Sequence, residues 1–135
     1  MKTNMAVFFG CRSVEHEVSV ISAVQAMNAI DRSKYEVIPV YVTKDGEMFT
    51  SPLLFDIESF KGNLDELVKK CEQVTFIRLK NKTVMRTLVS NLFKKSKDTV
   101  IDLAFPIVHG TNCEDGTMAG YFEFLNLPYI SCDII

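Results

Sequence analysis

Residues 100–125 read VIDLAFPIVHGTNCEDGTMAGYFEFL, and this stretch decides the fold. The apolar run at 100–108 has the composition of a buried strand, and a loop with glycine, asparagine and two adjacent acids follows it. Apolar residues then recur with the spacing of one helix face, at 118, 121, 122 and 125. Ligands of open α/β sheets bind where loops leave the carboxyl ends of strands. We therefore expect His109 at a strand tip, and Glu114 and Asp115 at the start of a helix.

The beginning of the chain has the same order of elements. Residues 5–9 form a short apolar run, the loop GCRSVEHE follows at 10–17, and a helical pattern begins at Val18. Two strand–loop–helix units with polar loops predict one shared site at the ends of neighbouring strands. The expected fold class is α/β, with three layers and a mostly parallel sheet of the Rossmann-like or flavodoxin-like kind.

Shorter elements are predicted around these two units. Pro39 cannot donate a ladder hydrogen bond, so the strand that contains it is expected towards an edge of the sheet. Pro128 is expected to stop the last helix, and residues 88–95 fit a helix as well as a strand end. The expected helices span about 17–30, 64–71 and 115–126, and the remaining strands span 35–43, 47–50, 74–79 and 83–89 (a hairpin), and 129–131.

Composition limits the classes of function. A length of 135 residues indicates one domain, and a net charge of −2 argues against nucleic-acid binding. Ten of the fifteen Lys and Arg lie at 61–97, which we interpret as a solvated face, with an anion-binding patch as the alternative. No secretory signal opens the chain, and no apolar run approaches the ~18 residues of a membrane span. We expect a cytoplasmic protein with reduced thiols and no membrane contact.

The spacing of residues favours neither a metal site nor a nucleotide site. His16 and His109 are far apart in the sequence, and the four cysteines form no C-x-x-C pair. The loop that starts at Gly10 lacks the glycines of a dinucleotide-binding motif, and no G-x-x-x-x-G-K-[ST] sequence occurs. No metal is therefore expected in this chain.

Two loop residues have both a structural and a functional interpretation. A carboxylate such as Glu15 near a helix start is favoured by the helix dipole by ~0.3–1 kcal/mol. Alternatively it recognises an ammonium group, because a buried carboxylate without a cation is costly. His109 is either a structural histidine or a substrate contact, with Gly110 allowing close approach of the backbone. The residues alone leave both alternatives open.

Two stretches resemble one protein family. The sequence FFGCRSVEHEVSVISA at 8–23 is similar to the N-terminal motif of D-alanine–D-alanine ligases. The sequence PIVHGTNCEDGTMAGYFEFLNLPYISCD at 106–133 is similar to their second motif. The resemblance covers residues 5–43 and 101–133, and its ending YISCD is similar to the branch that contains vancomycin-resistance ligases.

The resemblance implies roles for residues in the two loops. Glu15 is expected to be the catalytic residue and to hold the ammonium group of the first D-alanine, whose methyl group contacts Val18. His109 and Gly110 are expected to line the same subsite. The residues expected to shape the loops are Gly10, Glu114, Asp115 and Gly116.

The resemblance also implies a larger enzyme. Residues 1–135 would be the N-terminal substrate-binding domain, of the pre-ATP-grasp type, and the central and C-terminal ATP-grasp domains would lie outside this chain. ATP would phosphorylate the carboxylate of the first D-alanine, and the amine of the second amino acid would attack the acyl phosphate, for peptidoglycan precursor synthesis. The full-length enzyme would use ATP and magnesium and form a homodimer. The chain alone is expected to bind no cofactor, to be inactive as a ligase, and to have D-alanine and the rest of the ligase as partners.

Two rival functions remain at this point. The first rival to the ligase is a noncatalytic binding or regulatory module that kept the fold. The second is a flavodoxin-like protein with another ligand. Cys11 and Cys113 stand where the ligase family usually has glycine, and their side chains lie in the two loops. Continuation of the reading frame past Ile135 into an ATP-grasp sequence would favour the ligase.

Overall fold

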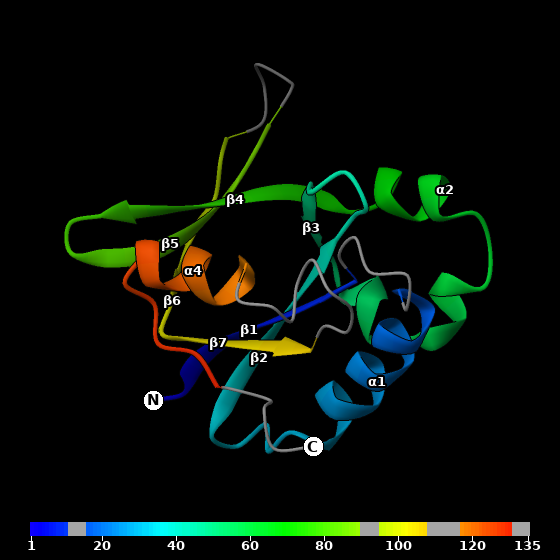
Figure 1. The fold of residues 1–135 in the computed structure, drawn as a ribbon, viewed down its shortest axis with the longest axis horizontal. Helices are drawn as coiled ribbons and strands as arrows, with labels where there is room; N and C mark the ends of the chain where they lie inside the picture. The colour runs from blue at the N-terminus through cyan, green and yellow to red at the C-terminus, as the bar shows by residue number, and fades with distance from the viewer. Residues whose placement is uncertain (11–15, 90–94, 108–116, 131–135) are drawn as a thin grey trace.

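The computed structural model describes residues 1–10, 16–89, 95–107 and 117–130 (Figure 1). These residues form a seven-stranded sheet with the strand order β6-β5-β4-β3-β2-β1-β7. The strands are β1 (Thr3–Gly10), β2 (Tyr35–Val42), β3 (Met48–Thr50), β4 (Glu72–Leu79), β5 (Lys82–Thr87), β6 (Asp98–Ile101) and β7 (Leu103–Ile107). The helices are α1 (His16–Ala29), α2 (Leu64–Lys69) and α4 (Thr117–Phe124), with 3₁₀ turns η1 (Pro52–Phe55) and η2 (Ile57–Phe60).

The sheet is mixed, so the expectation of a mostly parallel sheet is wrong. β1 pairs in parallel with β2 and β7, whereas the β2–β3, β3–β4, β4–β5 and β5–β6 pairs are antiparallel. Short turns cause much of this, because a parallel pair needs a crossover of a dozen or more residues. Lys80 and Asn81 join β4 to β5 with φ values of 52° and 65°, which suits a two-residue hairpin. This hairpin and the helix expected at 64–71 are confirmed by β4, β5 and α2.

The expected single strand at 100–108 is two strands divided at Asp102. The backbone N–H of Asp102 donates to the Asn4 carbonyl at 2.9 Å, and its carboxylate accepts from the Asn4 N–H at 2.8 Å. β6, on one side of this residue, pairs with β5, and β7, on the other side, pairs with β1. The chain therefore passes directly from one edge of the sheet to the other, and the sheet curls until its edges meet. Periodicity did not reveal this, because residues 100–101 and 103–107 read as one apolar run that only Asp102 interrupts.

The expectation that Pro39 places its strand towards an edge is also wrong, since β2 lies between β1 and β3. The carbonyl of Pro39 accepts a hydrogen bond from the Thr50 hydroxyl at 2.6 Å, so it faces β3. In a strand, the nitrogen and carbonyl of one residue face the same side. The pairing of β2 with β3 involves only Tyr41 and Val42 of β2, so the missing N–H costs no ladder bond.

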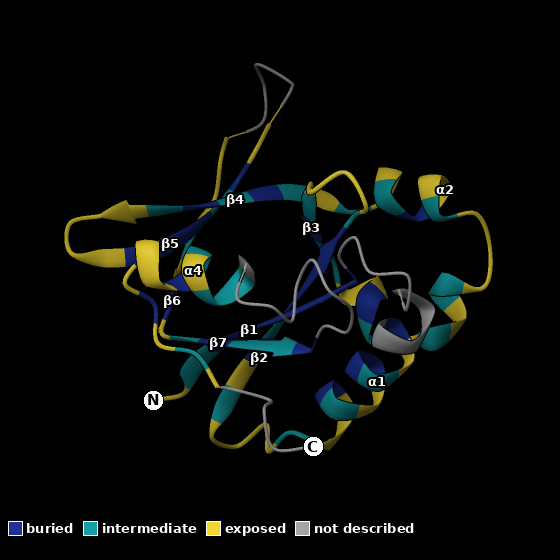
Figure 2. Ribbon diagram, viewed as in Figure 1, coloured by how far each residue is buried: buried dark blue, intermediate teal, exposed yellow. Residues whose placement is uncertain are grey.

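Helices cover both faces of the strands around β1. Ala6 and Phe8 pack in one buried cluster with Phe122 of α4, whereas Val7 and Phe9 pack in a second cluster with α1. β1 is therefore buried on both sides, which explains its unbroken apolar sequence. Figure 2 shows this buried strand between helices whose outward sides are exposed. The helix expected at about 17–30 is confirmed as α1, in which Val20, Ala23, Val24 and Met27 are buried.

The last helix ends four residues before Pro128, at Phe124. Asn126 has a φ of 54°, and the N–H of Leu127 donates to the carbonyl of Phe122 at 2.9 Å. This is the bonding of a Schellman motif, in which a left-handed residue closes the helix. The strand expected at 129–131 is reduced, within the described residues, to a bridge between Tyr129 and Ala104 of β7.

Candidate functional site at the carboxyl edge of the parallel strands

The neighbouring parallel strands β2, β1 and β7 have their carboxyl ends side by side, along one side of the sheet. Gly10 at the end of β1 pairs with Val42 of β2, and the preceding Phe9 pairs with Ile107 of β7. α1 and α4 follow β1 and β7 in the chain, and Figure 1 shows β1 and β7 running in the same direction. The expectation that the strands leading into the two motifs are neighbours is confirmed. The loops after β1 and β7 therefore begin next to each other.

Most of the expected site residues lie outside the described residues. These are Glu15, His109, Gly110, Glu114, Asp115 and Gly116. Val18 belongs to the first turn of α1, and Gly10 is the last residue of β1. The structure thus gives the two strands from which the loops start, and the roles of the loop residues stay predictions.

The backbone at Gly10 requires glycine. Its φ is +94°, and an added Cβ would lie 2.5 Å from the carbonyl oxygen of Val42 and 2.9 Å from Cε1 of Tyr41. A φ in this region is strained for residues with a side chain. The point at which the chain leaves β1 is therefore set by contact between two neighbouring strands.

Replacing Gly10 with Ala should lower the free energy of unfolding by roughly 2–3 kcal/mol, because strain and a backbone clash act together. Urea unfolding followed by circular dichroism measures this change. Gly120→Ala is the matched control, since nothing lies within 4 Å of a Cβ built there and the helical backbone favours Ala by up to about 1 kcal/mol. Equal losses of stability in the two variants would contradict the prediction.

Three aromatic rings pack beneath Gly10. The ring centroids of Phe9 and Tyr41 are 5.7 Å apart, and Phe60 of η2 lies 5.7 Å from Tyr41 and 5.9 Å from Phe9. Tyr41 is 2% exposed, and this burial raises the pKa of its phenol to about 12. The phenol therefore stays protonated at neutral pH and is unsuited to act as a general base. The sequence pattern did not single out Tyr41 or Phe60, because such rings look like ordinary core residues.

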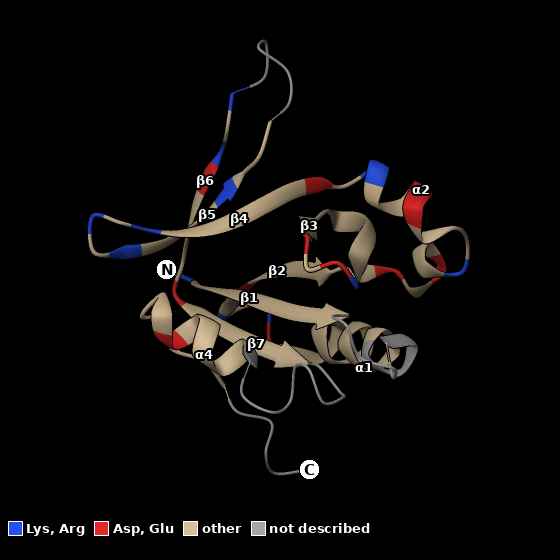
Figure 3. Cartoon of the chain, turned by 45° about the horizontal axis from the view of Figure 1, so that its top comes forward, with Lys and Arg blue, Asp and Glu red and all other residues tan. Residues whose placement is uncertain are grey.

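Positive charge is concentrated away from this edge. The elements that form the edge, β1, β2, β7, α1 and α4, contain no Lys or Arg. Arg78, Lys80 and Lys82 are exposed around the β4–β5 turn, which lies towards the opposite end of the molecule from the end of β1 (Figures 1 and 3). Arg86 is paired with Asp98 across β5 and β6 at 2.8 Å. The exposure of Arg78, Lys80 and Lys82 agrees with the predicted solvated face, and the alternative of an anion-binding patch at 61–97 stays a prediction.

In the part of the chain that the structure describes, no three His, Cys, Asp or Glu side chains are grouped to hold a metal ion. No helix among the described residues is both long and apolar enough to cross a membrane. Lys44 is exposed on the turn between Thr43 and Glu47 that follows β2.

Comparisons with known proteins agree on one family. The family model described as "D-ala D-ala ligase N-terminus" matches residues 4–132. The D-alanine–D-alanine ligase of Thermosipho melanesiensis is 43% identical over 130 residues, which are 96% of this chain and 34% of that protein. The ligase of Geobacillus thermodenitrificans is 35% identical over 135 residues, which are 100% of this chain and 35% of that protein.

Solved structures agree with the sequence relatives. The D-alanine–D-alanine ligase of Coxiella burnetii has a TM-score of 0.75 at 31% identity, covering 96% of this chain and 35% of that one. The VanG D-Ala:D-Ser ligase of Enterococcus faecalis has a TM-score of 0.72 at 26% identity, covering 98% and 36%. The chain spans about a third of the length of the curated relatives it matches. It belongs to the family of D-alanine–D-alanine ligase N-terminal domains.

Proposed function

We propose that this chain forms the first D-alanine subsite of an ATP-dependent D-alanine–D-alanine ligase. The observation that carries the proposal is the parallel pairing of β1 with β7, which starts the two motif loops at adjacent positions of one sheet edge. Family membership supplies the reaction class. The complete protein would be a cytoplasmic enzyme of peptidoglycan precursor synthesis that acts as a homodimer.

In this proposal the two loops hold the first D-alanine from two sides. Glu15 accepts hydrogen bonds from its ammonium group, and Val18 contacts its methyl group. His109 and Gly110 line the subsite from the second loop, and the structural residues of the loops are Gly10, Glu114, Asp115 and Gly116. The contribution of these residues is orientation of the reacting carboxylate, which supplies about 7–11 kcal/mol when an active site is complete.

ATP and magnesium do not fit the described residues of this chain. The elements that form the sheet edge contain no cationic side chain, and no metal-binding group occurs among the described residues. Both would be held by the central and C-terminal domains of the complete protein, outside residues 1–135. The domain proposed here would therefore orient an amino acid towards a nucleotide bound elsewhere.

A second candidate is a ligase that joins D-alanine to D-serine. It is favoured by the similarity to VanG, a D-Ala:D-Ser ligase, at a TM-score of 0.72. The assignment to the vancomycin-resistance branch stays a prediction, because relatives described as D-alanine–D-alanine ligases are more similar in sequence, at 43% identity. The second amino acid would be selected outside this chain.

The direct test uses the complete protein that contains this chain. With ATP, magnesium and D-alanine it should release phosphate and form D-alanyl-D-alanine. A phosphate assay measures the first product and mass spectrometry the second. D-Serine and D-lactate offered beside D-alanine identify the second substrate. Residues 1–135 alone should show neither ligation nor micromolar ATP binding by calorimetry. A complete protein that binds D-alanine without turning it over would support the noncatalytic module instead.

A further inference from the structure

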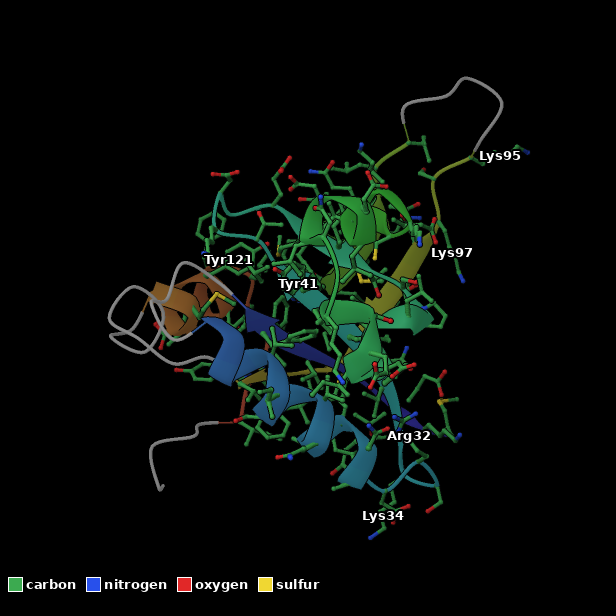
Figure 4. All side chains as sticks on the ribbon, turned by 90° about the vertical axis from the view of Figure 1, so that its right-hand side faces the viewer. Arg32, Lys34, Tyr41, Lys95, Lys97 and Tyr121 are labelled. Carbon is green, nitrogen blue, oxygen red and sulfur yellow. The ribbon has the colours of Figure 1, made fainter. Side chains whose placement is uncertain are left out.

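An aromatic cluster from three separate elements lies directly under the start of the first motif loop. It consists of Phe9 of β1, Tyr41 of β2 and Phe60 of η2, with centroid distances of 5.7–5.9 Å. Figure 4 views the molecule from the side at which β1 ends and shows Tyr41 among the packed side chains near its centre. Rings at such separations attract each other beyond simple burial and hold a defined geometry.

The cluster touches the backbone of Gly10. Cε1 of Tyr41 is 2.9 Å from the position that a Cβ of Gly10 would occupy. The Tyr41 ring therefore packs directly against the end of β1. Gly10 is the residue at which β1 ends and the loop containing Glu15 begins. The Tyr41 ring therefore lies against the backbone from which that loop starts.

Phe60 is itself held firmly, although it is only half-buried. Asp56 caps η2 by accepting from the N–H of Glu58 at 3.0 Å, and Ser51 caps η1 by accepting from the N–H of Leu53 at 3.1 Å. Leu54 of η1 is fully buried against α1 and anchors the segment. These contacts hold the segment that carries Phe60, whose ring packs against Tyr41. The proposed function assigns no role to this segment.

We propose that Tyr41 and Phe60 are positioning residues for the first D-alanine subsite. They set the direction in which the chain leaves β1 at Gly10 and, through it, the place of Glu15. The inference rests on the proposed function. Active sites depend on such supporting residues, because a misplacement of about 1 Å can cost up to 10²-fold in rate.

The test is kinetic and uses the complete protein. Phe60→Leu and Tyr41→Leu should raise the KM for D-alanine at the first subsite about tenfold and leave the KM for ATP unchanged. Phe76→Leu is the matched control, since it also removes a buried ring (5% exposed) but from the cluster on the other face of the sheet. A purely structural role would lower the amount of active protein, and so kcat, without changing either KM.

Tyr41→Phe keeps the ring and should recover most of the loss seen in Tyr41→Leu. If Tyr41→Leu fails to fold, Phe60→Leu decides, because a half-buried ring contributes less to stability. An unchanged KM for D-alanine in a folded Phe60→Leu protein overturns the inference and leaves the proposed function standing. A complete protein that makes no D-alanyl product before any substitution overturns both.

Discussion

Replacing Glu15 with Gln in the complete protein should lower kcat/KM for the first D-alanine about ten- to hundredfold. The proposed subsite uses the Glu15 carboxylate to accept hydrogen bonds from the substrate ammonium group. Loss of one charge-assisted hydrogen bond costs about 1.5–3 kcal/mol, which corresponds to this range of catalytic efficiency. Steady-state kinetics across D-alanine concentrations measure the effect. The KM for ATP should stay the same.

Glu17→Gln is the matched control for this substitution. Glu15 directly precedes α1 in the sequence and Glu17 is the second residue of α1, so a dipole role would apply to both. If the dipole were the whole role of Glu15, each variant would lose about 0.3–1 kcal/mol of stability and neither would change the kinetics. Equal kinetic effects in the two variants, or none in Glu15→Gln, would remove Glu15 from the subsite.

His109→Ala, measured for melting temperature beside kinetics, makes the same distinction in the second loop.

Replacing Phe122 with Ala should lower the free energy of unfolding by about 3–5 kcal/mol, as expected for truncation of a buried aromatic ring. The Phe122 side chain is fully buried, and its ring centroid lies 4.9 Å from Phe8 and 5.5 Å from Tyr129. The substitution would leave a cavity between α4 and β1. Urea unfolding of the chain, followed by circular dichroism, measures the change.

Phe124→Ala provides the control in the same helix. Phe124 is 87% exposed, so its truncation should change stability by no more than about 0.5 kcal/mol. Both variants alter α4 by the same chemical step and differ only in burial. If both lost similar stability, burial of the Phe122 ring against β1 would not explain the effect.

Local pattern predicted the elements well and their partners poorly. The β4–β5 hairpin was predictable because Asn81 suits its turn, and α1 because its apolar residues repeat with helical spacing. Which strands lie side by side depends on contacts across the chain, such as Asn4 with Asp102, and these leave no periodic signal. The parallel content of the sheet was overestimated for that reason.

For the candidate site too, the sequence predicted one part and missed another. The adjacency of the strands that lead into the two motif loops followed from a general rule, since parallel strands carry their carboxyl ends to the same side of the sheet, and the pairing of Phe9 with Ile107 agrees with it. Tyr41 and Phe60 gave no such signal, because the proposed role arises from the contact of Tyr41 with Gly10 and of Phe60 with Tyr41 rather than from their own chemistry. A glycine at a strand end beside aromatic residues is the pattern that could have pointed to them.

The passage of the chain through Asp102 also has a consequence for self-association. The carbonyl of Val100 in β6 accepts from the Asn4 side chain at 2.7 Å, and Ala104 in β7 is bonded to Pro128 and Ile130. These backbone groups of the two edge strands are thus hydrogen-bonded within the same molecule. An edge strand with unpaired backbone groups is a template for pairing with a strand of another molecule, which leads to aggregation. The turn at Asp102 that joins β6 to β7 therefore leaves fewer free backbone groups for strand addition at these positions.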